Sequence, residues 1–275
     1  MPYFFNRQGL RLYYNSWGSG QPVALVHGWP LSSETWELIA LRLAEHGYRA
    51  VSYDRRGFGR SEKPWSGYDY GSLANDLSDL IEYLELDECV GVGFSMGGGE
   101  IAAYADRETS RPWKAVALIS SIVPALGRSG DNPDGVDSAT FDSLKHNLAR
   151  DRPAAISSFL KEFYGDHLFH GNVSDELFAW TRGLALQASL PATLACVDVF
   201  SQADFRRSIR TWSTPTLVIH GSEDAVVPID PTGRAAASAI AGAVLREYDG
   251  APHGLLATHG EQVAEDLLAF LGRVG

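Results

Sequence analysis

The chain has 275 residues, of which 45% are hydrophobic, and its formal net charge at pH 7 is −11. This length and hydrophobic content are sufficient for one large domain with a substantial core. The strong negative charge argues against nucleic acid and anionic membrane surfaces as partners, because both are themselves negatively charged. No apolar run reaches the roughly 18 residues that a membrane-spanning helix needs, so no membrane partner is predicted.

The first residues and the two cysteines indicate the cellular compartment in which the protein is expected. Residues 1–7 lack the basic start and the long apolar core of a signal peptide. Cys89 and Cys196 are expected to be free thiols, packed as small apolar residues in a reducing compartment. We therefore expect a cytoplasmic protein that acts on small molecules, and the sequence leaves a homo-oligomer open.

In chain order, apolar runs bounded by glycine, proline or polar residues predict strands, and apolar residues at helical spacing predict helices. Strands are expected in the first half at residues 3–5, 10–14, 23–26, 49–53, 89–92 and 115–119. Helices are expected from Ser33, as the N-cap, to a stop at Gly47, over residues 72–86, and over residues 101–105. The first two strands are predicted to pair as an antiparallel hairpin, and the others are typical of a buried parallel sheet.

The strand–helix alternation breaks at about Pro124 and resumes after about Arg210. Three or four helical segments are expected between these points. The pattern then returns, with strands over residues 216–220 and 244–248 and helices over residues 232–240 and 262–271.

An alternation that is interrupted in this way predicts an α/β fold with a mostly parallel central sheet of about eight strands, flanked by helices. We expect an α/β core over residues 1–124 and 211–275 and a helical cap inserted over residues 125–210.

The sequence Gly93-Phe94-Ser95-Met96-Gly97 lies where a predicted strand passes into a helix. The pattern G-x-S-x-G requires glycine on both sides because the turn is strained and leaves no room for a side chain. Such a turn lifts the serine hydroxyl above the sheet and directs the free N–H groups of the helix start toward the atom it attacks. Ser95 is therefore predicted to be a nucleophile.

A serine hydroxyl needs a base to take its proton and a carboxylate to orient that base. Two loops at the carboxyl ends of later strands, where ligand sites of such sheets lie, carry these residue types. The first holds Glu223 and Asp224, and the second holds His253. The chain order serine, acid, histidine is the one that this architecture uses, and both carboxylates remain candidates for the acid.

The chain resembles the α/β-hydrolase family, and specifically its cofactor-free (non-haem) haloperoxidase, perhydrolase and arylesterase group. The matching stretches are residues 27–30, 53–61, 93–99, 220–224 and 251–254. The resemblance implies the α/β-hydrolase fold, with Ser95 as the nucleophile, His253 as general base and then acid, and Asp224 rather than Glu223 as the orienting carboxylate. It also implies that the backbone N–H groups of Trp29 and Met96 hold the oxyanion.

By the same resemblance, the protein is a serine hydrolase that forms an acyl-enzyme from small carboxylic esters or acids. Hydrogen peroxide is then a second substrate, and the resulting peracid oxidises halide without haem or metal. Trp29-Pro30 accompanies perhydrolysis in that group, because proline restricts the residue before it and so sets the direction of the Trp29 carbonyl. No cofactor and no metal are expected. The alternatives are a lactamase or amidase with the same triad, and a non-catalytic ligand-binding protein on this fold.

An acyl pocket is predicted between the serine turn and the cap. Its apolar and aromatic walls suit small acyl or aryl esters and offer no charged anchor for an acidic substrate. The predicted wall residues are Trp29, Pro30, Ile122, Leu126, Phe159, Phe163, Val226 and Val227, with Phe94 and Val123 as further candidates.

The remaining histidines receive structural interpretations. His27 and His220 are expected to be buried and hydrogen-bonded, and the loop that begins Asp54-Arg55-Arg56 is expected to form ion pairs. His167 and His170 have a spacing that suits a metal, but no third ligand is evident, so no metal site is predicted there.

Overall fold

A computed structural model describes residues 2–165 and 173–274 of the chain. Eight strands form one sheet in the order β1-β2-β4-β3-β5-β6-β7-β8. The strands are β1 (Tyr3–Phe5), β2 (Arg11–Trp17), β3 (Gln21–Val26), β4 (Tyr48–Tyr53), β5 (Val90–Phe94), β6 (Ala115–Ile119), β7 (Thr216–Gly221) and β8 (Val244–Tyr248). The pairs β1–β2 and β2–β4 are antiparallel and all other pairs are parallel, which confirms the predicted mostly parallel sheet.

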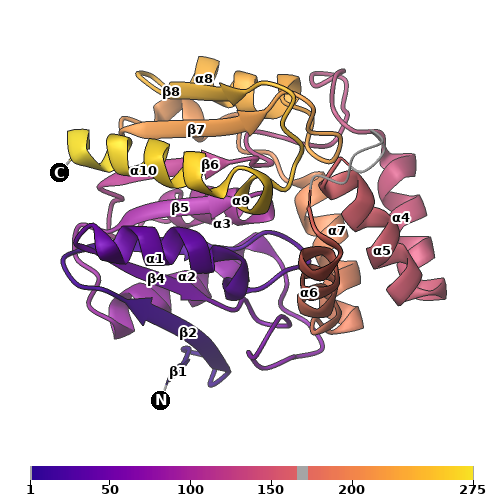
Figure 1. The fold of residues 1–275 in the computed structure, drawn as a ribbon, viewed down its shortest axis with the longest axis horizontal. Helices are drawn as coiled ribbons and strands as arrows, with labels where there is room; N and C mark the ends of the chain where they lie inside the picture. The colour runs from indigo at the N-terminus through magenta and orange to yellow at the C-terminus, as the bar shows by residue number, and fades with distance from the viewer. Residues whose placement is uncertain (1, 166–172, 275) are drawn as a thin grey trace.

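Helices cover both faces of this sheet (Figure 1). One face carries α1 (Glu37–Glu45) and α10 (Gly260–Val274), which pack together, and the other carries α2 (Tyr70–Tyr83) and α3 (Met96–Ala105). Two shorter helices, α8 (Ala235–Ala239) and α9 (Leu255–Thr258), flank β8 in the sequence. The central strands β5 and β6 are buried along their whole length, as the continuous apolar runs predict.

In the described part of the chain, four α-helices lie between β6 and β7 in the sequence, on the side of the sheet toward which the parallel strands run (Figure 1). They are α4 (Ser138–Arg150), α5 (Arg152–Phe163), α6 (Asp175–Leu186) and α7 (Leu190–Gln202). Each begins after an aspartate or serine whose side chain accepts a hydrogen bond from a backbone N–H of the first turn. The division of the chain into a core and a cap at residues 125 and 210 stays a prediction.

The predicted N-cap at Ser33 is wrong. Ser33 opens a short 3-10 helix, Ser33–Trp36, that precedes α1. Its backbone N–H and its hydroxyl both donate to Oδ1 of Asp54, at 2.8 and 2.6 Å. The hydroxyl therefore binds a buried carboxylate of the loop after β4 instead of capping the helix.

The loop after β4 forms the predicted ion pairs, and they are buried. The Arg55 guanidinium lies 2.7 Å from a carboxylate oxygen of Glu100 on α3, and both side chains have no exposed surface. Arg56 pairs with Asp76 on α2 at 2.6 Å. These pairs join the loop to the two helices on one face of the sheet.

No single helix among the described residues is long and apolar enough to cross a membrane. The helices α6 and α7 meet the length and composition criteria only as a pair, and they are bent by 95° relative to each other.

We expect Arg55→Met to lower the free energy of unfolding by about 3–5 kcal/mol, because it leaves the Glu100 carboxylate buried without its partner. Urea denaturation followed by circular dichroism measures this loss. The matched control is Arg111→Met, which breaks the exposed pair of Arg111 with Asp87 and should cost less than about 1 kcal/mol. Equal losses in the two variants would contradict the assigned role of the buried pair.

Candidate active site

The Ser95 turn joins β5 to α3 in a backbone conformation that side chains rarely adopt. Ser95 has φ 54° and ψ −121°. An added Cβ on Gly93 would collide with Gly98 at the start of α3, and one on Gly97 would collide with the carbonyl of Val26. The surrounding structure therefore holds the strained serine in place, and its N–H donates to the carbonyl of Ile119 on β6 at 2.9 Å.

Three predicted residues meet at this turn through consecutive hydrogen bonds. Nδ1 of His253 lies 2.7 Å from Oδ2 of Asp224, and Nε2 of His253 lies 3.0 Å from the Ser95 hydroxyl oxygen. A carboxylate only accepts, so the imidazole proton lies on Nδ1 and Nε2 is free to accept from the serine hydroxyl. The arrangement can move a proton from Ser95 to His253.

The structure places Asp224, and not Glu223, against His253. Glu223 is exposed, whereas Asp224 is buried. Oδ1 of Asp224 accepts from the backbone N–H groups of Val226 and Val227, at 3.0 and 2.7 Å. Burial alone would raise the pKa of Asp224, but the charge of His253 and the hydrogen bonds from His220 and His253 outweigh it and hold that pKa well below its usual range.

Two aromatic side chains hold the His253 ring. The centroid of the Phe94 ring lies 5.2 Å from the centroid of the imidazole. The Phe163 ring lies edge-on to the imidazole, with 5.0 Å between the centroids. The backbone N–H of Gly254 also donates to the carbonyl of Phe163 at 2.8 Å. The end of α5 therefore packs directly against the histidine loop.

The loop after β3 brings Trp29 to the start of α3. A Cβ added to Gly28 would lie 3.0 Å from Cβ of Ser95, so the two chain segments are in direct contact. Among the described residues, no hydrogen bond occupies the backbone N–H of Trp29 or of Met96. Two unused donors beside a serine hydroxyl are what an oxyanion site needs.

A buried network of polar groups holds the loop after β3 in place. His27 donates from Nδ1 to the carbonyl of Gly28 at 2.8 Å, and its Nε2 accepts from the backbone N–H of Arg55 at 3.1 Å. The Arg55 guanidinium donates to the His27 carbonyl at 2.8 Å while it binds Glu100. His27 is buried and hydrogen-bonded, as predicted, and both of its ring nitrogens take part.

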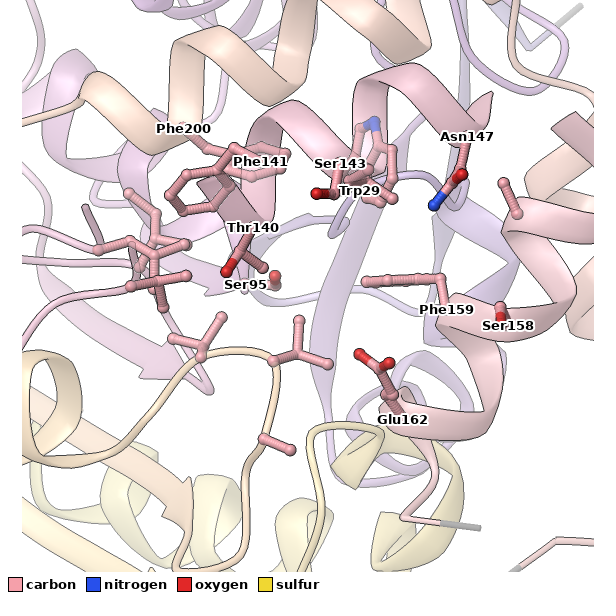
Figure 2. A pocket seen from close by; sticks show the side chains of 18 of the residues that line it. Trp29, Ser95, Thr140, Phe141, Ser143, Asn147, Ser158, Phe159, Glu162 and Phe200 are labelled. Carbon is pink, nitrogen blue, oxygen red and sulfur yellow. The ribbon is translucent and has the colours of Figure 1, made fainter. Parts of the chain in front are cut away.

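A cavity of about 620 Å³ opens over Ser95 and is roofed by α4, α5 and α7 (Figure 2). Six of the predicted wall residues line it: Trp29, Ile122, Leu126, Phe159, Val226 and Val227. The Trp29 indole packs against these helices. Its N–H donates to the carbonyl of Thr193 at 3.1 Å, and its ring lies edge-on to the Phe159 ring, with 5.0 Å between the ring centroids. The cavity therefore lies between the edge of the sheet and the helices α4, α5 and α7.

Pro30, Phe163 and the further candidates Phe94 and Val123 are not among the residues that line this cavity, so for these four the structure departs from the prediction. Phe163 turns away because its ring packs on His253 and Phe94. Pro30 is buried within the loop after β3, where only its neighbour Trp29 faces the cavity; the peptide bond between them is cis.

Several wall residues were missed by the sequence analysis. The missed residues are apolar and polar side chains of the helices above the cavity, among them Thr140, Phe141, Ser143, Asn147, Phe200, Ser158 and Glu162 (Figure 2). Charged side chains also line the cavity: Asp151 and Glu162, which are acidic, and Arg150, a cation that the prediction of no charged anchor for an acidic substrate did not include. Helical spacing of apolar residues in this part of the sequence indicates a buried helix face, but it does not indicate what that face covers.

Within residues 2–165 and 173–274, no group of three or more His, Cys, Asp or Glu side chains is arranged to hold a metal ion. His167 and His170 lie outside the described residues. Both cysteines are free and buried, and burial raises the pKa of each thiol to about 12.

Comparison with known proteins agrees with this geometry. The chain is 37% identical over 99% of its length to a non-heme chloroperoxidase of Kitasatospora aureofaciens, which is covered completely. It is 35% identical to a bifunctional esterase/perhydrolase of Acinetobacter calcoaceticus, over 98% of this chain and 99% of the other.

Among solved structures, a bromoperoxidase from Bacillus anthracis superposes with a TM-score of 0.93 at 39% identity, covering 98% of this chain and 99% of the other. The family described as alpha/beta hydrolase fold matches residues 21–259. The fold, the serine turn and these similarities together show that the chain belongs to the alpha/beta hydrolase fold family.

Proposed function

We propose that this protein is a serine hydrolase that forms an acyl-enzyme from small carboxylic esters or acids and transfers the acyl group to water or to hydrogen peroxide. The observation that carries the proposal is the continuous hydrogen-bonded series from Asp224 through His253 to Ser95, at the base of a cavity. The esterase/perhydrolase and chloroperoxidase relatives support the choice of reaction. The same series argues against a non-catalytic binding protein.

In the first half-reaction, the Ser95 hydroxyl oxygen attacks the carbonyl carbon of the ester while Nε2 of His253 takes the hydroxyl proton. The negative charge that develops on the carbonyl oxygen is held by the N–H groups of Trp29 and Met96. Asp224 stabilises the protonated imidazole. His253 then gives the proton to the leaving alcohol, and the acyl group remains on Ser95.

In the second half-reaction, water or hydrogen peroxide attacks the acyl-enzyme and gives a proton to His253. The ester bond to Ser95 breaks, and the proton returns to its hydroxyl oxygen. Water yields the carboxylic acid, and peroxide yields the peracid. The peracid transfers one oxygen atom to halide outside the site and becomes the carboxylic acid, so no redox cofactor takes part.

The shape of the cavity supports small acyl or aryl groups as substrates. Its volume lies within the range of roughly 300–1,000 Å³ that is usual for small-molecule sites. Many of the side chains that line the cavity are apolar, and Asn147, Ser158 and Glu162 lie farther from Ser95 on α4 and α5 (Figure 2). We infer that residues 125–210 act as a cap that shapes this cavity, and from the two free cysteines that the protein is cytoplasmic.

We expect Ser95→Ala to lower kcat for p-nitrophenyl acetate by about 10⁶-fold and to abolish covalent labelling by a fluorophosphonate, because the attacking oxygen is gone. Mass spectrometry of the labelled protein measures the second effect. Ser158→Ala is the matched control, since Ser158 lines the same cavity without contacting His253. Labelling of the Ser95→Ala variant at the parental rate would show that another residue is the nucleophile.

Glu162 should discriminate against anionic substrates. Its carboxylate faces the cavity from α5 (Figure 2). Two like charges about 6 Å apart in water repel by roughly 0.7 kcal/mol, or about threefold in a rate constant. Glu162→Gln should therefore raise kcat/KM for p-nitrophenyl hemisuccinate about threefold and leave kcat/KM for neutral p-nitrophenyl acetate unchanged.

The control for this measurement is Glu176→Gln, which removes the same charge from the exposed start of α6, away from the cavity lining. A similar gain in both variants would mean that net charge, and not the position of Glu162, governs the preference.

A further inference from the structure

A second imidazole lies against the Asp224 carboxylate and has no role in the mechanism above. His220 lies in β7 and is fully buried. Its Nε2 is 2.8 Å from the carbonyl oxygen of Val227 and 3.3 Å from Oδ2 of Asp224. Oδ2 is the oxygen that binds Nδ1 of His253.

The surroundings of His220 determine which ring nitrogen carries the proton. The Val227 carbonyl only accepts, so the proton lies on Nε2 and is directed toward both Val227 and Asp224. Nδ1 has no hydrogen-bond partner among the described residues. Gly233 lies so close that a Cβ there would be 2.6 Å from Nδ1. The ring is therefore closely packed, and its single N–H faces Val227 and Asp224.

His220 and Asp224 bind opposite ends of the same residue. The N–H of Val227 donates to Oδ1 of Asp224 at 2.7 Å, and the carbonyl of Val227 accepts from His220 at 2.8 Å. The turn that positions the carboxylate is thus tied to β7, a strand in the interior of the sheet. Because the His220 N–H also faces Oδ2, it favours the ionised carboxylate in the orientation that His253 requires.

We propose that His220 is a positioning residue for the proposed catalytic acid: it holds the turn of residues 224–227 so that Oδ2 of Asp224 faces His253. The proposal rests on the proposed function. It explains why a histidine stands at the carboxyl end of β7, where another buried side chain could fill the volume but could not donate this hydrogen bond.

Two amide variants test this, because they place an N–H donor at different positions of the lost ring. The amide nitrogen of His220→Gln lies near the position of Nε2, and that of His220→Asn lies near the position of Nδ1. We expect His220→Gln to retain kcat within about threefold of the parent and His220→Asn to lose about tenfold or more, with KM for p-nitrophenyl acetate unchanged in both. His259→Gln, which removes a half-buried histidine outside the site, is the control.

Proton NMR supplies a readout that does not depend on turnover. The proton between Nδ1 of His253 and Asp224 should give a far-downfield resonance in the parent and in His220→Gln, and this resonance should move upfield or broaden in His220→Asn. Circular dichroism establishes that each variant is folded.

Equal kcat values and unchanged resonances in the two folded amide variants would overturn the proposal. If neither variant folds, the imidazole is needed for stability alone and the proposal is also overturned. A parent that shows the resonance but neither hydrolyses the ester nor reacts with a fluorophosphonate would refute the proposed function, while the resonance still tests the role of His220.

Discussion

The close approach of α3 to the strands beneath it is the constraint on which the site depends. The serine between β5 and α3 keeps φ at 54° because there is no room on either side for it to relax: Gly93 faces Gly98, and Gly97 faces the carbonyl of Val26. This packing lifts the Ser95 hydroxyl out of the sheet and points the start of α3 at the same space. Every other feature of the site is arranged around that fixed oxygen.

The partners of Ser95 come from loops far apart in the sequence, and the parallel sheet brings them to one edge. Asp224 follows β7 and His253 follows β8, and backbone N–H groups and aromatic rings then fix each side chain. The buried Arg55–Glu100 pair connects the loops after β3 and β4 to α3. Such a pair contributes to geometry more than to stability, because burial of both charges offsets most of their attraction.

Local patterns in the sequence predicted the strands and the serine turn, because each depends on neighbouring residues. The charges of the loop after β4 predicted ion pairs, but not their partners Glu100 and Asp76, which the fold brings from two helices. The choice of Asp224 over Glu223 required either the family resemblance or the structure. The two residues are adjacent in one loop, and only the backbone conformation of that loop decides which carboxylate faces His253. The cavity wall was predicted in part. Pro30 and Phe163 lie near the site but face elsewhere, and Glu162 and Asn147 belong to helices whose placement over Ser95 depends on tertiary packing that no local pattern encodes.

If one acyl-enzyme reacts with both water and peroxide, the two nucleophiles compete for that intermediate, and the ratio of their products reveals the competition. Parent protein and the Ser95→Ala variant would be given p-nitrophenyl acetate over a range of hydrogen peroxide concentrations, with acetate and peracetic acid measured in quenched samples. We expect the peracetic acid fraction to rise with peroxide concentration for the parent only. Ester turnover in which peracetic acid never exceeds the level without enzyme would contradict it and would identify the protein as a plain esterase.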